Sequence, residues 1–146
     1  MTQEERKELI EYLQEIDPDI EFDKDNEDKL IGYAERFGGA IIPMYQGVNT
    51  FFIKEIGDLI AEVTQFNSRA RIADGFEDTL IGYMNIDGYY VFLHDREKMI
   101  EKMISEYKSD PLFDGDDLYL MAMENYEFNI IGAYMEGVPA FAVIGE

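Results

Sequence analysis

The heptapeptide EDKLIGY at residues 27–33 recurs as EDTLIGY at residues 77–83, with six of seven positions identical. Each copy is β-prone and is followed by a turn and a second β-prone run: AERFGG and AIIPMY after the first, MNIDG and YYVFLH after the second. Each copy therefore predicts a β-hairpin. A glycine inside a β-prone run usually marks a bulge or a close approach of two backbones, so we expect Gly32 and Gly82 to tolerate substitution poorly.

Apolar residues at helical spacing follow both hairpins and predict a helix after each. They are Phe52, Ile53, Ile56, Leu59, Ile60 and Val63 after the first, and Met99, Ile100, Met103, Ile104 and Tyr107 after the second. A further helix is predicted over 2–16, where Thr2 and Glu5 form a capping box. Beyond residue 108 we expect a helix over about 117–126 and a hairpin made of NIIGAYM and PAFAVIG.

These elements predict an α+β fold, in which an N-terminal helix precedes two β-β-α units and the second unit is extended by a helix and a C-terminal β-hairpin. We expect a single compact domain over 1–146, with an internal repeat spanning 20–65 and 74–146. The stretch FNSRARIADG at 66–75 is the linker candidate, although the apolar helix faces on both sides indicate that the halves pack together.

The chain has no cysteine, and its N-terminal stretch MTQEERKELIEYLQEI lacks the basic start and the apolar run of a secretory signal. No apolar run approaches the length of a membrane span. These features predict a soluble cytoplasmic protein, in the host cell if a phage encodes it.

The charge of the chain is strongly negative, because 32 acidic and 12 basic residues give −20. Residues 1–28 carry −9 (12 acidic, 3 basic), residues 29–109 carry −3 (12 and 9), and residues 110–146 carry −8 (8 and none). Self-repulsion on this scale costs stability, which suggests a use for the charge. Nucleic acids and anionic membranes prefer basic partners, so we expect neither as a direct partner and predict a basic protein surface instead.

Acidic residues occupy alternate positions in the stretch 17–27, at Asp17, Asp19, Glu21, Asp23, Asp25 and Glu27. In an extended strand their carboxylates would line one face about 6.5–7 Å apart, and this row would imitate a polyanion. The alternative is an edge strand or loop kept soluble by its charges, with Ile20 and Phe22 turned inward.

A second acidic cluster, DGDD, occupies residues 114–117. It matches no complete calcium loop, and capping of the following helix by Asp116 or Asp117 is favoured over metal binding. No basic residue follows Lys108, so we expect this cluster to widen an acidic surface formed with 17–28. Tyr119, Tyr126 and Tyr134 are the tyrosines expected to contact a partner. The predicted partner-binding residues are Asp17, Asp19, Glu21, Asp23, Asp25, Asp28, Asp114, Asp116, Asp117 and Tyr119.

His94 is the sole histidine and precedes Asp95, a pair that suggests a general base. However, no serine lies in a nucleophile elbow, and neighbouring side chains on a strand point to opposite faces. A structural role at the junction of strand and helix is therefore predicted. From Arg96 to Lys108 basic and acidic residues interleave, which indicates a balanced, solvated helix face. We predict no catalytic residue, no cofactor and no metal site.

The segments DTLIGY at 78–83 and YEFNIIGAY at 126–134 resemble the start and finish of a group of small proteins from phages and mobile elements. The resemblance covers about residues 74–144, and residues 21–65 resemble a shortened second copy, so the chain looks like a partial tandem duplication. Because that group has no assigned chemistry, the resemblance implies a phage-like setting and transfers no catalytic residue.

Charge and setting together predict a non-enzymatic, phage-type inhibitor. It would bind the basic, nucleic-acid-binding surface of a host defence complex, such as a CRISPR effector or a restriction enzyme. One alternative is an enzyme or sensor that holds a divalent ion, which needs carboxylates that converge on one point. Another is a small structural or assembly protein, which would expose an apolar patch.

Overall fold

The computed structural model describes residues 1–113, 115–132 and 137–144. Within these residues six strands form one sheet in the order β2-β1-β6-β5-β4-β3. Neighbouring strands are antiparallel, except that β5 and β6 run parallel. The strands are β1 (Leu30–Arg36), β2 (Ala40–Tyr45), β3 (Thr50–Phe52), β4 (Leu80–Ile86), β5 (Tyr89–Asp95) and β6 (Ala140–Ile144).

Helices account for most of the remaining described chain. They are α1 (Gln3–Ile16), α2 (Ile56–Phe66), α3 (Arg96–Lys108), α4 (Leu118–Asn125), the π-helix η5 (Tyr126–Ile131) and the 3₁₀ turns η1 (Lys24–Lys29), η2 (Phe37–Gly39), η3 (Glu77–Thr79) and η4 (Pro111–Phe113). The predicted capping box of α1 is confirmed, because Thr2 and Glu5 each accept the other's backbone N–H. Within the described residues, no helix has the length and apolar character needed to span a membrane.

The predicted α+β fold is confirmed, with one difference in the first β-β-α unit. Phe52, which the sequence placed in the helix, belongs to β3, so three strands precede α2, whereas two strands, β4 and β5, precede α3 in the second unit. Both units begin with a 3₁₀ turn, and in both the first strand shifts register after its first residue, at Leu30 and at Leu80. A Cβ added to Gly32 would lie 2.2 Å from the Val143 carbonyl oxygen, and one added to Gly82 would lie 2.0 Å from that of Phe51. The prediction that these glycines mark a bulge and a close backbone approach is therefore confirmed.

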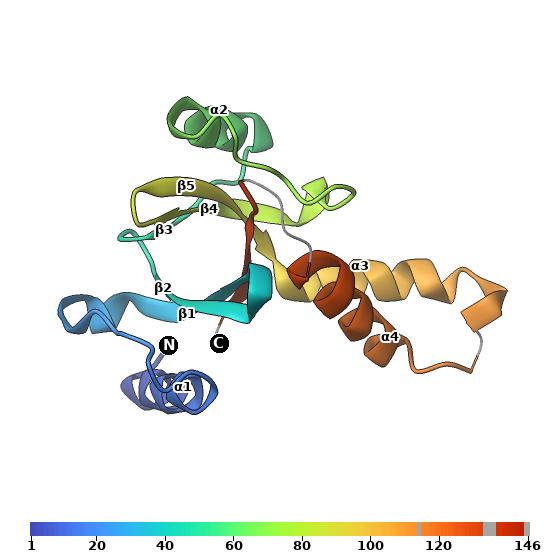
Figure 1. Cartoon of the computed structure of the whole chain (residues 1–146), viewed down its shortest axis with the longest axis horizontal. Helices are drawn as coiled ribbons and strands as arrows, with labels where there is room; N and C mark the ends of the chain where they lie inside the picture. Colours follow the sequence, from blue (N-terminus) through green and yellow to red (C-terminus); the bar gives the residue numbers. More distant parts are fainter. Residues whose placement is uncertain (114, 133–136, 145–146) are drawn as a thin grey trace.

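The sheet curls around an apolar interior, with β4 and β5 on one side, β1 and β2 on the other and β6 between them (Figure 1). The helices cover the outside: α2 lies against β4 and β5, α3 against β5 and β6, and α1 against β1. The two strands that contribute two buried residues each, β5 and β6, contribute alternate residues, as the pleat requires. The buried interior residues are Ala34, Met44, Met84, Val91, Leu93, Ala140 and Ala142.

Asn49 links the edge strand β2 to β4. Its Oδ1 accepts the Tyr45 N–H at 2.7 Å, and its Nδ2 donates to the Pro43 carbonyl at 2.9 Å, so the side-chain amide pairs with β2 as a strand residue would. The Asn49 carbonyl accepts the Asn85 N–H of β4 at 2.9 Å. This bridge protects part of an edge that would otherwise present unpaired backbone groups.

The predicted C-terminal hairpin is wrong in its first strand. Asn129, Ile130 and Ile131 belong to η5, and residues 133–136 lie outside the described part of the chain. The second run forms β6, which pairs with β1 and β5. A short apolar run suits a buried helix as well as a strand, and here the helical form buries Tyr126 and Ile131 in the cluster that packs against α3.

Candidate functional site

The acidic stretch 17–28 is a capped loop and not the predicted extended strand. Asp17 Oδ1 accepts the Asp19 N–H at 3.1 Å, and Asp23 Oδ1 accepts the Asp25 N–H at 3.1 Å, where η1 begins. Aspartate side chains that bind nearby backbone N–H groups in this way compete with strand pairing. The predicted single row of carboxylates along one strand face is therefore wrong.

The same loop is anchored to the rest of the molecule by its apolar residues. Ile20 and Phe22 are half-buried, as the alternative interpretation of the stretch as a solvated loop expected. The Asp23 N–H donates to the Tyr45 hydroxyl at 2.8 Å, and burial raises the pKa of this phenol. The loop backbone is thus fixed while its carboxylates face solvent.

The exposed carboxylates of this loop lie at the same end of the molecule as those of α1, and we call the combined set the N-terminal acidic surface (Figure 1). Asp17 is partly exposed at its border. The acidic residues that α1 adds to this surface could have been found from the sequence, because residues 1–28 carry 12 of the 32 acidic residues. The members are Glu4, Glu8, Glu11 and Glu15 from α1 and Asp19, Glu21, Asp23, Asp25, Glu27 and Asp28 from the loop.

The C-terminal acidic cluster lies elsewhere. Asp117 caps α4 by accepting the Leu120 N–H at 3.1 Å, which confirms the favoured capping role, and Asp116 is exposed beside it. Asp114 lies outside the described residues. The described residues of this segment, 110–113 and 115–117, and the loop 17–28 are at opposite ends of the long axis of the molecule (Figure 1), so the expectation that they form one acidic surface is wrong.

The three suspected tyrosines have different surroundings. Tyr119 is 54% exposed at the start of α4, where a partner can reach it. Tyr126 is buried, so the expectation that it contacts a partner is wrong. Tyr134 lies outside the described residues.

His94 fixes a loop from the end of β5. It is fully buried, and its Nε2 accepts the Ala73 N–H at 3.0 Å, so Nε2 carries no proton. The neutral ring then holds its proton on Nδ1, which donates to Thr79 Oγ1 at 2.9 Å. The Thr79 hydroxyl donates in turn to the Phe76 carbonyl at 2.8 Å. Burial lowers the pKa of His94 to about 4. These contacts give His94 the structural role expected from the sequence.

Asp95 does not act on the His94 ring. Its side chain caps α3 and accepts the Lys98 N–H at 3.3 Å. The two residues are consecutive on β5, so their side chains leave the strand in opposite directions. The arrangement therefore does not form the pair of a general base and its orienting carboxylate.

A largely buried polar cluster joins β1, α3 and η5. The Arg96 guanidinium contacts the Glu35 carboxylate, whose other oxygen accepts the Tyr126 hydroxyl at 3.1 Å. Burial raises the pKa of Tyr126, and raises that of Tyr33 to about 12. The interpretation of Arg96 as part of a solvated helix face is wrong. No local pattern signals this cluster, because Glu35 is 61 residues from Arg96 and 91 from Tyr126.

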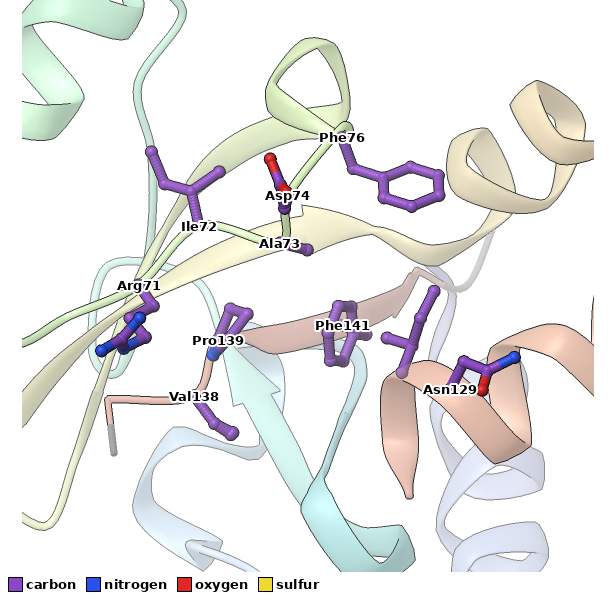
Figure 2. A pocket seen from close by; sticks show the side chains of 10 residues that line it. Arg71, Ile72, Ala73, Asp74, Phe76, Asn129, Val138, Pro139 and Phe141 are labelled. Carbon is purple, nitrogen blue, oxygen red and sulfur yellow. The ribbon is translucent and has the colours of Figure 1, made fainter. Parts of the chain in front are cut away.

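A pocket of about 620 Å³ opens between the loop 71–76 and the segment 138–141 (Figure 2). Val138, Pro139 and Phe141 are buried and form an apolar floor, with Arg71 at one end. His94 shapes this pocket indirectly, because it binds Ala73 of the loop and stacks on Phe141 with ring centres 5.7 Å apart. The pocket therefore offers apolar surface and a guanidinium group.

Among the described residues, few polar side chains line this pocket. Its polar lining side chains are Arg71, Asp74 and Asn129, which do not include a serine, threonine or histidine. Among the described residues, no three His, Asp or Glu side chains converge on a point where they would hold a metal ion.

No protein-family model, curated protein or solved structure matches the chain. The resemblance to small phage proteins thus stays a prediction from two sequence motifs. Function has to be inferred from the surfaces of this chain, because a fold by itself does not define a function.

Proposed function

We propose that this chain is a non-catalytic binding protein whose N-terminal acidic surface occupies a basic, nucleic-acid-binding surface of another protein. In the setting that the resemblance implies, it is a phage-type polyanion mimic and its partner is a host defence complex. The observation that carries the proposal is the gathering of ten exposed carboxylates, from α1 and the loop that follows it, at one end of the molecule.

These carboxylates are accessible to an external cation, although Asp23 uses both of its carboxylate oxygens to accept hydrogen bonds, from the Asp25 N–H and from Asn26 Nδ2. In the described part of the chain the ion pairs between side chains involve Glu35 and Asp78, neither of which belongs to residues 1–28. Lys29, which follows the acidic loop, donates to Asn26 Oδ1 at 3.2 Å. Their negative charge is therefore not neutralised within the described structure.

The acidic loop is also organised before a partner arrives. The caps made by Asp17 and Asp23 and the bond from Asp23 to Tyr45 restrain its backbone. Binding then costs less conformational entropy than it would for a disordered acidic tail. A groove lined with arginine and lysine accepts such a surface in place of phosphates, and long-range attraction accelerates the encounter.

The proposal is tested with two variants of equal net charge. In the first, Asp19→Asn, Glu21→Gln, Asp23→Asn and Asp25→Asn remove four charges from the N-terminal acidic surface. In the matched control, Asp58→Asn, Asp87→Asn, Glu97→Gln and Glu101→Gln remove four exposed charges elsewhere. Asparagine at position 23 still caps η1, so the first variant should fold.

Wild-type chain is immobilised to capture proteins from a bacterial lysate, and binding of each captured protein is then measured with all three forms. We expect duplex DNA to compete for the captured protein, and the first variant to associate about tenfold more slowly than the control at low salt. Equal losses in both variants would mean that only total charge matters. Retention in the presence of excess DNA would contradict the mimicry of a nucleic acid.

A further inference from the structure

The outward side of α4 and η5 exposes two large apolar side chains. Leu120 is 54% exposed and Phe128 is 77% exposed, while Ala122 and Tyr126 on the inward side are buried. The inward side belongs to the cluster that packs against α3, so the fold itself leaves Leu120 and Phe128 in water. Large apolar groups exposed along one side of a helix are typical of an interaction surface.

Helix geometry places these two side chains on one stripe. At 100° per residue, residues 120, 124 and 127 fall within about 60° of one another around the axis. The chain then widens into a π-helix, shown by the Gly132 N–H that donates to the Glu127 carbonyl at 3.0 Å across five residues. The wider turn brings Phe128 closer to the stripe, about 12 Å along the axis from Leu120. π-Helical turns are rare and often lie at functional sites.

The same stretch of chain carries exposed carboxylates. Asp116, Glu124 and Glu127 are exposed, and the stretch 109–132 contains no lysine or arginine. We call Leu120, Phe128 and these three acidic residues the α4 face. It is separate from the N-terminal acidic surface, because α4 and α1 lie on different sides of the sheet (Figure 1).

We propose that the α4 face binds a basic amphipathic helix of a partner protein, with two apolar residues two turns apart and lysine or arginine beside them. Apolar residues at positions i and i+7 of a helix are about 11 Å apart, which matches the spacing of Leu120 and Phe128. Basic side chains next to them meet Glu124 and Glu127. A second copy of this chain fits less well, since each copy carries −20, and an anionic membrane has the wrong sign.

The probe is a fluorescein-labelled helical peptide of about 18 residues, made of alanine and lysine with two leucines seven positions apart. Binding is followed by fluorescence anisotropy. Leu120→Ser and Phe128→Ser should each weaken binding about tenfold. Leu112→Ser is the matched control, because Leu112 is 84% exposed in η4 outside the α4 face, and it should change binding less than about twofold. Circular dichroism checks that all variants fold.

Two further measurements separate apolar anchoring from simple charge attraction. Glu124→Gln combined with Glu127→Gln should weaken binding and reduce its dependence on salt. The variant with four amides at 19, 21, 23 and 25 should bind the peptide within about twofold of wild type, so the proposal does not depend on the N-terminal acidic surface. A peptide of the same composition with its leucines on opposite faces should bind at least about tenfold more weakly.

Three results would overturn the proposal. The first is equal binding of the two peptides, or equal losses in the Leu112 and Leu120 variants. The second is a dimer of the wild-type chain in sedimentation that Phe128→Ser dissociates, because the occupant would then be a second copy. The third is binding to neutral lipid vesicles that Leu120→Ser and Phe128→Ser abolish.

Discussion

Replacing His94 with glutamine should remove a pH dependence of stability that the burial of this ring creates. In the folded protein His94 is fully buried and its pKa is lowered to about 4 by that burial, partly opposed by Glu77 and Asp78 nearby. In the unfolded chain the ring returns to its ordinary pKa of 6.5. Between these two values the unfolded state binds a proton that the folded state does not bind, so acidification favours unfolding.

The magnitude follows from the two pKa values. A depressed pKa contributes stability that is present above pH 6.5 and is lost as the pH falls towards 4. One pKa unit corresponds to about 1.4 kcal/mol, so the difference between 6.5 and about 4 makes the folded protein lose roughly 3 kcal/mol through His94. Most of this loss should have occurred by pH 4.5. A loss of this size is a large fraction of the unfolding free energy of a typical small domain.

The assay is urea unfolding followed by circular dichroism from pH 7.5 to pH 4.5, for wild type and His94→Gln. The many carboxylates titrate in both proteins, so the difference between their unfolding free energies isolates His94. We expect the advantage of wild type over the variant to shrink by roughly 2–3 kcal/mol on acidification. A difference that stays constant with pH would refute the reasoning, because it would mean that His94 titrates alike in the folded and unfolded states.

Three further changes test the packing and hydrogen bonding of the sheet by urea unfolding. Gly82→Ala should lower the unfolding free energy by at least about 3 kcal/mol, because the added Cβ would lie 2.0 Å from a carbonyl oxygen. Gly57→Ala is the control, because its added Cβ has its nearest contact at 3.4 Å, and similar losses in the two variants would contradict the close approach at Gly82. Asn49→Ala should cost about 1–3 kcal/mol because Tyr45 and Pro43 lose their partners at the strand edge, and no loss would mean that water replaces the amide. Tyr126→Phe should cost about 1–2 kcal/mol through the lost donor to Glu35, and a stability gain would show that the bond is weak.

Several features of this protein could be predicted from the sequence because they depend on residues close together in the chain. The α1 capping box links Thr2 to Glu5, and the cap of α4 links Asp117 to Leu120, each across three residues. The β-prone runs and turns of the two EDxLIGY segments define two antiparallel hairpins. The concentration of negative charge in residues 1–28 is likewise a property of the sequence alone.

Other features were decided only by contacts between distant segments. The run PAFAVIG contains nothing that selects β1 and β5 as neighbours of β6. Residues 129–131, the start of the other apolar run, are helical because that form buries Tyr126 and Ile131. The sequence likewise could not show that Glu35 lies beside Arg96, or that His94 holds Ala73. Such pairings depend on how the sheet curls, and periodicity carries no information about that.

For the acidic segments, too, the sequence determined one property and the tertiary structure another. Their charge was determined by the sequence, but their placement was not: 17–28 joins α1 at one end of the molecule, while residues 110–113 and 115–117 lie at the other end (Figure 1). Net charge is a sum over residues and needs no geometry, whereas a surface needs its members to lie side by side. Packing of α3 and α4 away from α1 therefore decided that this chain presents two separate acidic surfaces.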